Sequence, residues 1–117
     1  MATSTIKPSV NKLKWLTYRT GSGSVTVDNS DGKYSEFVVI LFYSGYLIPI
    51  TIPVGMITTS YRTFAVSHAE VGAVSYYGTV RVKKDSSEKF TFNLNGFYDH
   101  TGSSVISSIE MNVHGRP

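Results

Sequence analysis

Cysteine is absent from this sequence of 117 residues. The chain therefore has no disulfide framework, no thiolate ligand for a metal and no cysteine nucleophile. Charge is also scarce, because Asp, Glu, Lys and Arg make up 16% of the residues and their balance is only +3. A surface that is polar but little charged is common in proteins that live outside cells or contact sugars. We expect one domain, since a chain of this length can bury a core without cross-links.

The stretch FVVILFYSGYLIPITIPVGM, part of an uncharged run that continues to Tyr61, is long enough to cross a membrane as a helix. Its composition argues against that. Ser44-Gly45 interrupts the run, and Pro49 and Pro53 would each break a helix, whereas the many β-branched residues favour strands. We predict two strands, 36–43 and 46–52, with a tight turn between them and the prolines at an edge or a strand end. Both faces of so apolar a pair should be covered, by the core on one side and by neighbouring subunits on the other.

The rest of the chain consists of short strand candidates separated by turn signals. They cover residues 12–19, 24–28, 61–67, 72–82, 88–94 and 105–113. In the clearest of them Phe90, Phe92 and Leu94 alternate with polar residues, and Asp31-Gly32 is a strong hairpin signal. Apolar residues do not recur at helical spacing. The prediction is therefore an all-β protein, a single-domain β-sandwich of jelly-roll type with about eight strands over 13–117, after a lead-in or linker at 1–12.

Motifs for catalysis and for cofactors are missing. His68-Ala69-Glu70 resembles the start of a zinc-deaminase element, which also requires cysteines that this chain lacks. There is no phosphate-binding loop, serine-hydrolase elbow or zinc-protease motif, and no pair of carboxylates is marked for glycoside hydrolysis. We expect a protein that is not an enzyme and holds no cofactor or metal.

The best candidate for a binding site is the segment 95–104, which we predict to be a loop between two strands and which carries Tyr98, Asp99 and His100. A tyrosine ring can stack on a pyranose, a carboxylate accepts hydrogen bonds from hydroxyls, and an imidazole donates or accepts. The second choices are an outward-facing tyrosine and a polar pair. These residues are Tyr76 or Tyr77, and His68 with Glu70.

A barrel that binds single-stranded nucleic acid is the alternative from another class. It would combine basic and aromatic side chains. These are Lys12, Lys14, Arg19, Arg81 and Lys83 with Trp15, Tyr18 and Tyr77. The positive charges are otherwise scattered, so nucleic acid is the less favoured partner. The first residues lack the apolar core of a secretion signal, and we expect neither secretion nor membrane insertion.

Three stretches, GKYSEFVVILFYSG, IPITIPVGMI and FAVSHAEVGAVSYYGTVRVKKDSSEKFTF, together resemble the small all-β receptor-binding or head domains at the tips of bacteriophage tail fibres and baseplates. The likeness spans roughly residues 14 to 113. The matching residues are Ile52, Pro53 and Gly55, then Gly78, Thr79, Val80 and Val82, then Lys89 to Phe92. The resemblance implies a virion component made in the host cytoplasm, usually trimeric, that contacts other tail proteins and binds cell-surface saccharide. A structural part of the virion without a ligand, such as an assembly or capsid-decoration protein, is the other possibility in this class.

Overall fold

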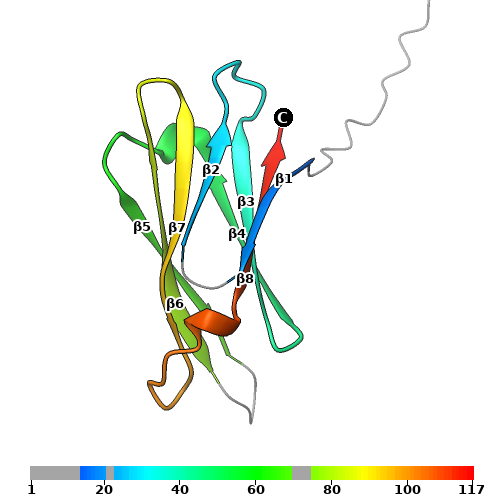
Figure 1. The fold of residues 1–117 in the computed structure, drawn as a ribbon, viewed down its shortest axis with the longest axis vertical. Coiled ribbons are helices and arrows are strands. Elements are labelled where there is room, and N and C mark those ends of the chain that lie inside the picture. The colour runs from blue at the N-terminus through cyan, green and yellow to red at the C-terminus, as the bar shows by residue number, and fades with distance from the viewer. Residues whose placement is uncertain (1–13, 21–22, 70–74) are drawn as a thin grey trace, which may run out of the picture.

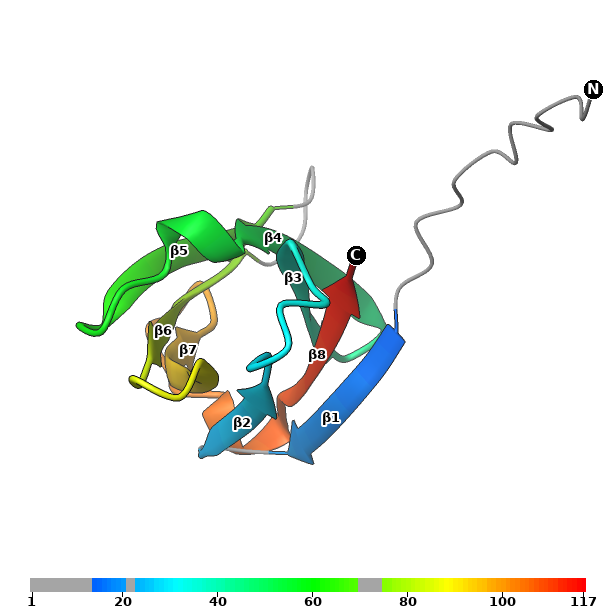
Figure 2. The same ribbon diagram turned by 90° about the horizontal axis from the view of Figure 1, so that it is seen from above.

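The computed structural model describes residues 14–20, 23–69 and 75–117, and these form two antiparallel sheets packed face to face (Figures 1 and 2). The first sheet has the order β1 (Lys14–Thr20), β8 (Glu110–Arg116), β3 (Glu36–Tyr43) and β4 (Tyr46–Pro53). The second has the order β2 (Ser24–Asp28), β7 (Lys89–Tyr98), β6 (Tyr76–Lys84) and β5 (Arg62–His68). Two short 3₁₀ helices, η1 (Val54–Met56) and η2 (Ile106–Ser108), lie in connections. The prediction of an all-β sandwich with eight strands is confirmed for the described chain.

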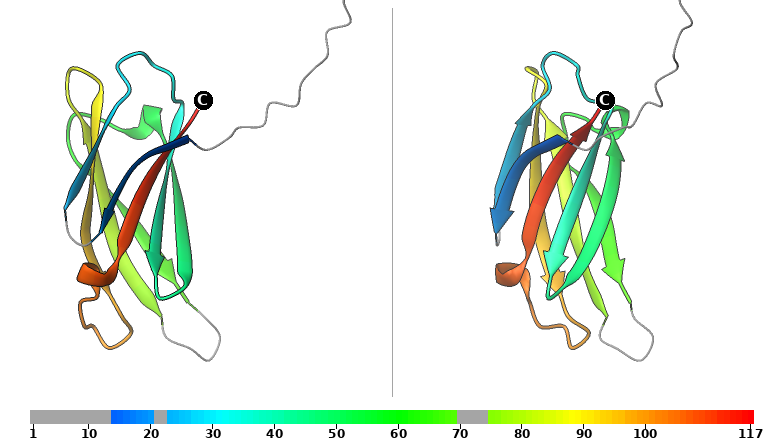
Figure 3. Two further views of the ribbon diagram at one scale, coloured as in Figure 1. Left: turned by 45° about the vertical axis from the view of Figure 1, so that its right-hand side comes forward. Right: turned by 90° about the vertical axis from the view of Figure 1, so that its right-hand side faces the viewer.

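Some of the described strands pair with strands far away in the sequence, and others pair with their sequence neighbours in hairpins. The first strand, β1, pairs with the last, β8, and the second, β2, pairs with the next-to-last, β7. This pairing of outer strands is also found in a jelly roll. The four middle strands instead form the hairpin of β3 with β4 and the meander of β5, β6 and β7. The right-hand view of Figure 3 looks onto the first sheet from its outer side.

The predicted hairpin in the apolar stretch is confirmed. Tyr43 pairs with Tyr46, and both turn residues have positive φ, 49° at Ser44 and 85° at Gly45, as a two-residue turn matching the strand twist requires. β4 is an edge strand, so Pro49 and Pro53 interrupt no ladder with a further strand. Within the described residues, no helix is long and apolar enough to cross a membrane.

The edge strand of the second sheet is built differently. β5 carries no proline, and no charged residue lies between Thr63 and Ser67. Its sequence RTFAVSH puts Phe64 and Val66 toward the core, as predicted, and the small residues between them toward the outside. The two edges on this side of the sandwich therefore differ in how they resist further pairing.

The core lies between the two sheets and is centred on phenylalanines. Phe37 of β3 is fully buried, and its ring centroid lies 5.1 Å from that of Phe90 and 5.2 Å from that of Phe92, both on β7. The alternation predicted for the strands is therefore correct at the positions that matter for packing. Buried core residues also include Val80, Val82, Leu94, Ile109, Met111 and Val113.

Several strand limits differ from the predicted ones. β7 continues to Tyr98, so the segment 95–104 is not a loop throughout, and β6 covers Tyr76–Lys84 instead of 72–82. The segment predicted as a strand at 105–113 begins with a half-buried Val105 and the helix η2, and its strand covers Glu110–Arg116. The expected lead-in at 1–12 lies outside the described residues.

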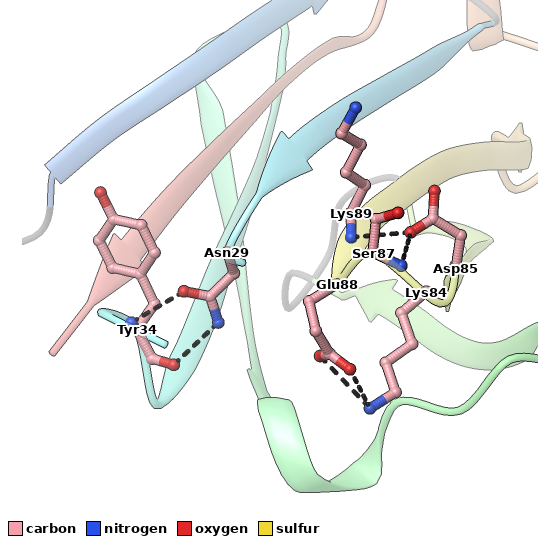
Figure 4. A network of polar contacts seen from close by, with 7 residues as sticks. All are labelled: Asn29, Tyr34, Lys84, Asp85, Ser87, Glu88 and Lys89. Carbon is pink, nitrogen blue, oxygen red and sulfur yellow. Dashed lines mark hydrogen bonds and ion pairs between the residues drawn. The ribbon is translucent and has the colours of Figure 1, made fainter. Parts of the chain in front are cut away.

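Asp31-Gly32 forms a turn but not a hairpin. Gly32 has a φ of 67° and its N–H donates to the carbonyl of Asn29 at 2.9 Å, yet β2 and β3 belong to different sheets. The buried Asn29 side chain fixes this crossing, because its Nδ2 donates to Tyr34 O at 3.1 Å and its Oδ1 accepts from Tyr34 N at 3.0 Å (Figure 4). The sequence signal specified the local turn and not the pairing partner.

The turn between β6 and β7, also in Figure 4, is fixed by the side chain of Asp85. Its Oδ1 accepts from the N–H of Ser87 at 2.8 Å and from that of Lys89 at 3.1 Å. Lys84 Nζ lies 3.0 Å from Glu88 Oε1 beside it. The acidic groups at this end of the sheet therefore already have partners.

The outer face of β3 and β4 is apolar. Val38 is only 4% exposed although its side chain points away from the core, Ile40 and Phe42 are half-buried, and Leu47 is 63% exposed. The ladder places Phe42 opposite Leu47 and Ile40 opposite Pro49. We call this set of five residues the β3–β4 outer face.

Candidate functional site

Tyr76 and Tyr77 point to opposite sides of β6, as adjacent strand residues must. Tyr76 faces inward and makes an edge-to-face contact with Tyr43, with ring centroids 4.8 Å apart. Tyr77 faces outward and is 48% exposed. The choice left open by the sequence is therefore resolved, and Tyr77 is the tyrosine that a ligand can reach.

Tyr77 lies beside Tyr98, and a β-bulge makes this possible. Thr79 of β6 is opposite two residues of β7, Asn95 and Gly96, because the register shifts between Gly78 and Val80. Without the extra residue, the alternation from the inward-facing Leu94 would turn Tyr98 into the core. The bulge re-aims Tyr98 toward the outside, which is a common use of such insertions.

Two glycines allow the strands to come this close. A Cβ atom on Gly78 would lie 2.2 Å from the carbonyl oxygen of Gly96, and Gly96 itself has a φ of 133° that side chains rarely adopt. The rings of Tyr77 and Tyr98 lie 5.5 Å apart and are inclined by 32°. We call these two outward-facing rings the tyrosine platform.

Asp99 organises the loop that follows the platform. Its Oδ1 accepts hydrogen bonds from Thr101 Oγ1 at 2.5 Å, Thr101 N at 2.9 Å and Ser103 N at 3.1 Å. These bonds, led by the one from the Thr101 hydroxyl, lower the pKa of Asp99. His100 is exposed at the tip of the turn. Asp99 and His100 thus flank the platform, but one oxygen of Asp99 is committed to the loop.

His68 does not reach the platform. It is half-buried on the inner face of β5, and its ring centroid lies 4.6 Å from that of Tyr46. Its Nε2 is buried and finds no hydrogen-bond partner among the described residues. Glu70, its predicted companion, lies outside the described residues. His68 and Tyr76 therefore belong to the packing between the sheets, and the predicted set divides into an outer group and an inner group.

A feature missed in the sequence lies on the same outer face, further along β6. Arg81 Cζ is 4.3 Å and Lys83 Nζ is 4.6 Å from the centroid of the Tyr61 ring, so two cations contact one aromatic ring. The period of two predicted that Arg81 and Lys83 point outward, and they do. The contact with Tyr61 depends on the pairing of β5 with β6, which no local pattern specifies.

The residues of the predicted nucleic-acid surface fall on different sheets. Lys14, Tyr18 and Arg19 lie on β1 of the first sheet, whereas Tyr77, Arg81 and Lys83 lie on β6 of the second. Lys12 and the Trp15 side chain are outside the described part of the structure. The described residues of that set do not form one groove.

The described part of the chain contains no group of three or more His, Asp or Glu residues that could hold a metal ion, and its surface has no pocket. No family model, no curated protein and no solved structure matches this chain.

Proposed function

We propose that this protein is a non-enzymatic recognition module that binds saccharide on the tyrosine platform and serves as part of a virion tail or baseplate at the host cell surface. The observation that carries the proposal is the pair of exposed tyrosine rings held side by side by a β-bulge. Tyr77 is 48% and Tyr98 is 37% exposed, so both rings keep a large apolar area that a ligand can cover. An arrangement that keeps both rings outside needs a reason beyond packing.

A pyranose suits this platform chemically. The ring faces provide apolar area for the C–H groups of the sugar, and the hydroxyls of Tyr77 and Tyr98 can donate or accept. Exposed polar residues that can bond sugar hydroxyls lie close to Tyr98 in the sequence, Asn95 in the bulge and His100 in the following turn. Individual contacts of this type are weak, and several copies acting together would supply useful adhesion.

The placement of the platform supports a role at a tip. β1 begins beside the end of β8, where Lys14 pairs with Gly115, so both ends of the described sandwich lie together. The segment 99–104, which follows Tyr98, lies at the opposite end (Figure 1). A module attached through either chain end would therefore present its platform away from the attachment.

The test is a glycan array probed with labelled protein. Removing one ring that buries about 50–60 Å² against a sugar, at about 25 cal/mol per Å², costs roughly 1.4 kcal/mol or a factor of ten in affinity. Tyr77→Ala and Tyr98→Ala should each show this loss. Tyr18→Ala removes a tyrosine that is 47% exposed on the other sheet and should bind as the wild type does. Unchanged binding by both platform variants would refute the proposal.

The β3–β4 outer face supports assembly of several copies, and we propose a homo-oligomer, a trimer as the tail-tip resemblance implies. The exposed Leu47 beside Phe42 and Pro49 is the kind of apolar surface that subunits cover. Sedimentation at micromolar concentration should give an oligomeric mass for the wild type and a smaller one for Leu47→Asp. Ser86→Asp, which adds the same charge in the exposed turn between β6 and β7, is the control. A monomeric wild type would contradict the proposal.

The same face favours one alternative, a structural virion protein that binds no ligand. An oligomeric mass together with an empty glycan array would support this alternative, because assembly would then be the only interaction left.

A further inference from the structure

We infer that the saccharide bound on the tyrosine platform carries an acidic group, and that Arg81 and Lys83 bind this group on the outer face of the second sheet. We call these two residues the basic pair. The inference rests on the proposed function and adds the chemical class of the ligand, a carboxylated or sulfated saccharide.

Arg81 is held in place by a relay of hydrogen bonds. Its Nε donates to Asn93 Oδ1 at 3.2 Å, and Asn93 Nδ2 lies 3.3 Å from Ser24 Oγ on the next strand. This arrangement uses the inner nitrogen of the guanidinium group. The two terminal nitrogens, which form the fork that matches a carboxylate or sulfate, have no hydrogen-bond partner among the described residues.

Neither cation of the basic pair is neutralised within the described part of the chain. The three ion pairs found there join Lys33 to Asp31, Lys84 to Glu88 and Arg116 to Glu36. On the same sheet, Asp28 at the end of β2 and Asp85 in the turn after β6 each accept hydrogen bonds from their own turns. Arg81 and Lys83 both contact the Tyr61 ring and point to the same side of β6, so their like charges repel each other, and a bound anion would offset that repulsion.

The basic pair and the platform share one face. Tyr77, Arg81 and Lys83 point outward from β6, and Arg81 comes four positions after Tyr77, a rise of about 13 Å along the strand. The residues between them on this face are small, Thr79 on β6 and its partner Ala65 on β5. A chain of a few sugar units can therefore lie flat between the rings and the cations.

A nucleic acid also offers anionic groups, but the observations favour a saccharide. Nucleic-acid affinity comes from neutralising many phosphates along a basic stripe. The basic pair provides two charges, and the two further lysines at this end of the sheet face acids, since Lys89 lies opposite Asp28 in the ladder and Lys84 pairs with Glu88. One acidic group fits this charge distribution better than a polyphosphate chain does.

The experiment compares binding of the intact chain to dextran (neutral), polygalacturonate (carboxylated), dextran sulfate (sulfated) and a deoxythymidine oligonucleotide. The test variant is Arg81→Gln with Lys83→Gln. The control is Lys14→Gln with Arg19→Gln on the other sheet, since both double variants remove two positive charges from the net +3. Thermal unfolding of each variant shows whether it is folded, and Arg81→Lys keeps the charge but loses the fork if a gentler change is needed.

The wild type should bind one of the acidic polysaccharides at least tenfold tighter than dextran, and this preference should weaken as salt is added. The test variant should lose about tenfold in affinity for the acidic polysaccharide and bind dextran as before, consistent with the loss of a charged hydrogen bond. The control should keep the preference.

The inference would be overturned by a test variant that keeps its preference, by a control that loses as much, or by tighter binding of the oligonucleotide through the same pair. Equal binding of dextran and the acidic polymers by the wild type would refute the inference alone. Binding of no polysaccharide at all would refute the proposed function with it.

Discussion

The close approach of β6 and β7 at the bulge makes Gly78 the most sensitive position of the platform. A methyl group at Gly78 would lie 2.2 Å from the carbonyl oxygen of Gly96, 2.6 Å from Cδ2 of Phe97 and 2.9 Å from Cα of Phe97. Two of these atoms belong to the backbone and cannot rotate away. Gly78→Ala must therefore move one strand by about an ångström, and overpacking of this kind costs roughly 1–3 kcal/mol.

The entropy that alanine saves in the unfolded chain offsets about 0.5–1 kcal/mol of this cost. The net expectation is a free energy of unfolding lower by about 1–2 kcal/mol, with a Tm lower by roughly 4 °C per kcal/mol. Urea unfolding measures the first quantity. Gly55→Ala is the matched control, because a methyl group at Gly55 would have no atom within 4 Å, and this variant should be neutral or slightly stabilising.

The same substitution should weaken saccharide binding, since the bulge sets the direction of Tyr98. If Gly78→Ala unfolds at the same urea concentration as Gly55→Ala and binds saccharide unchanged, then the two strands are not in close contact at Gly78 and the bulge does not position Tyr98.

Three further predictions concern the core and two titrating groups. Phe37→Ala, at a fully buried ring between the sheets, should lower the free energy of unfolding by about 3–5 kcal/mol in urea titration, and Phe37→Leu by less than half as much. Because hydrogen bonds lower the pKa of Asp99, loop order should be present at neutral pH and be lost as the pH falls through that lowered pKa; amide exchange at Thr101 should report this, and Asp99→Asn should show no such transition. Burial lowers the pKa of His114, so the unfolded chain takes up the proton first and Tm should fall as the pH drops below about 6.5, a slope that His114→Gln should reduce.

Alternation and turn chemistry were sufficient to predict most strands. The buried Phe90, Phe92 and Leu94 followed from a period of two, and the apolar hairpin followed from Ser44-Gly45 and the prolines. Both signals are local, because they express which face of a strand is apolar and where the backbone must adopt positive φ.

Long-range pairing was not predictable in this way. Asp31-Gly32 has the same local signature whether its flanking strands pair or cross to another sheet, and here they cross. The candidate site was harder to predict than the strands, because the outward direction of Tyr98 depends on one extra residue at Gly96. Gly96, inside an alternating segment, was the sequence signal for a bulge. A bulge at this position predicts that the strand continues to Tyr98 and that the Tyr98 side chain points outward.

The unequal edges of the sandwich have a consequence for how copies of this protein can join by backbone hydrogen bonds. On β4 two prolines lack the N–H that an incoming strand would need, so that sheet is closed to extension at Pro49 and Pro53. On β5 the five residues Thr63 to Ser67 offer an unbroken row of backbone groups without charge. Of these two edges, β5 is therefore the one open to growth of a sheet from molecule to molecule, in concentrated solution or during refolding, and a single lysine at Ala65 would oppose it.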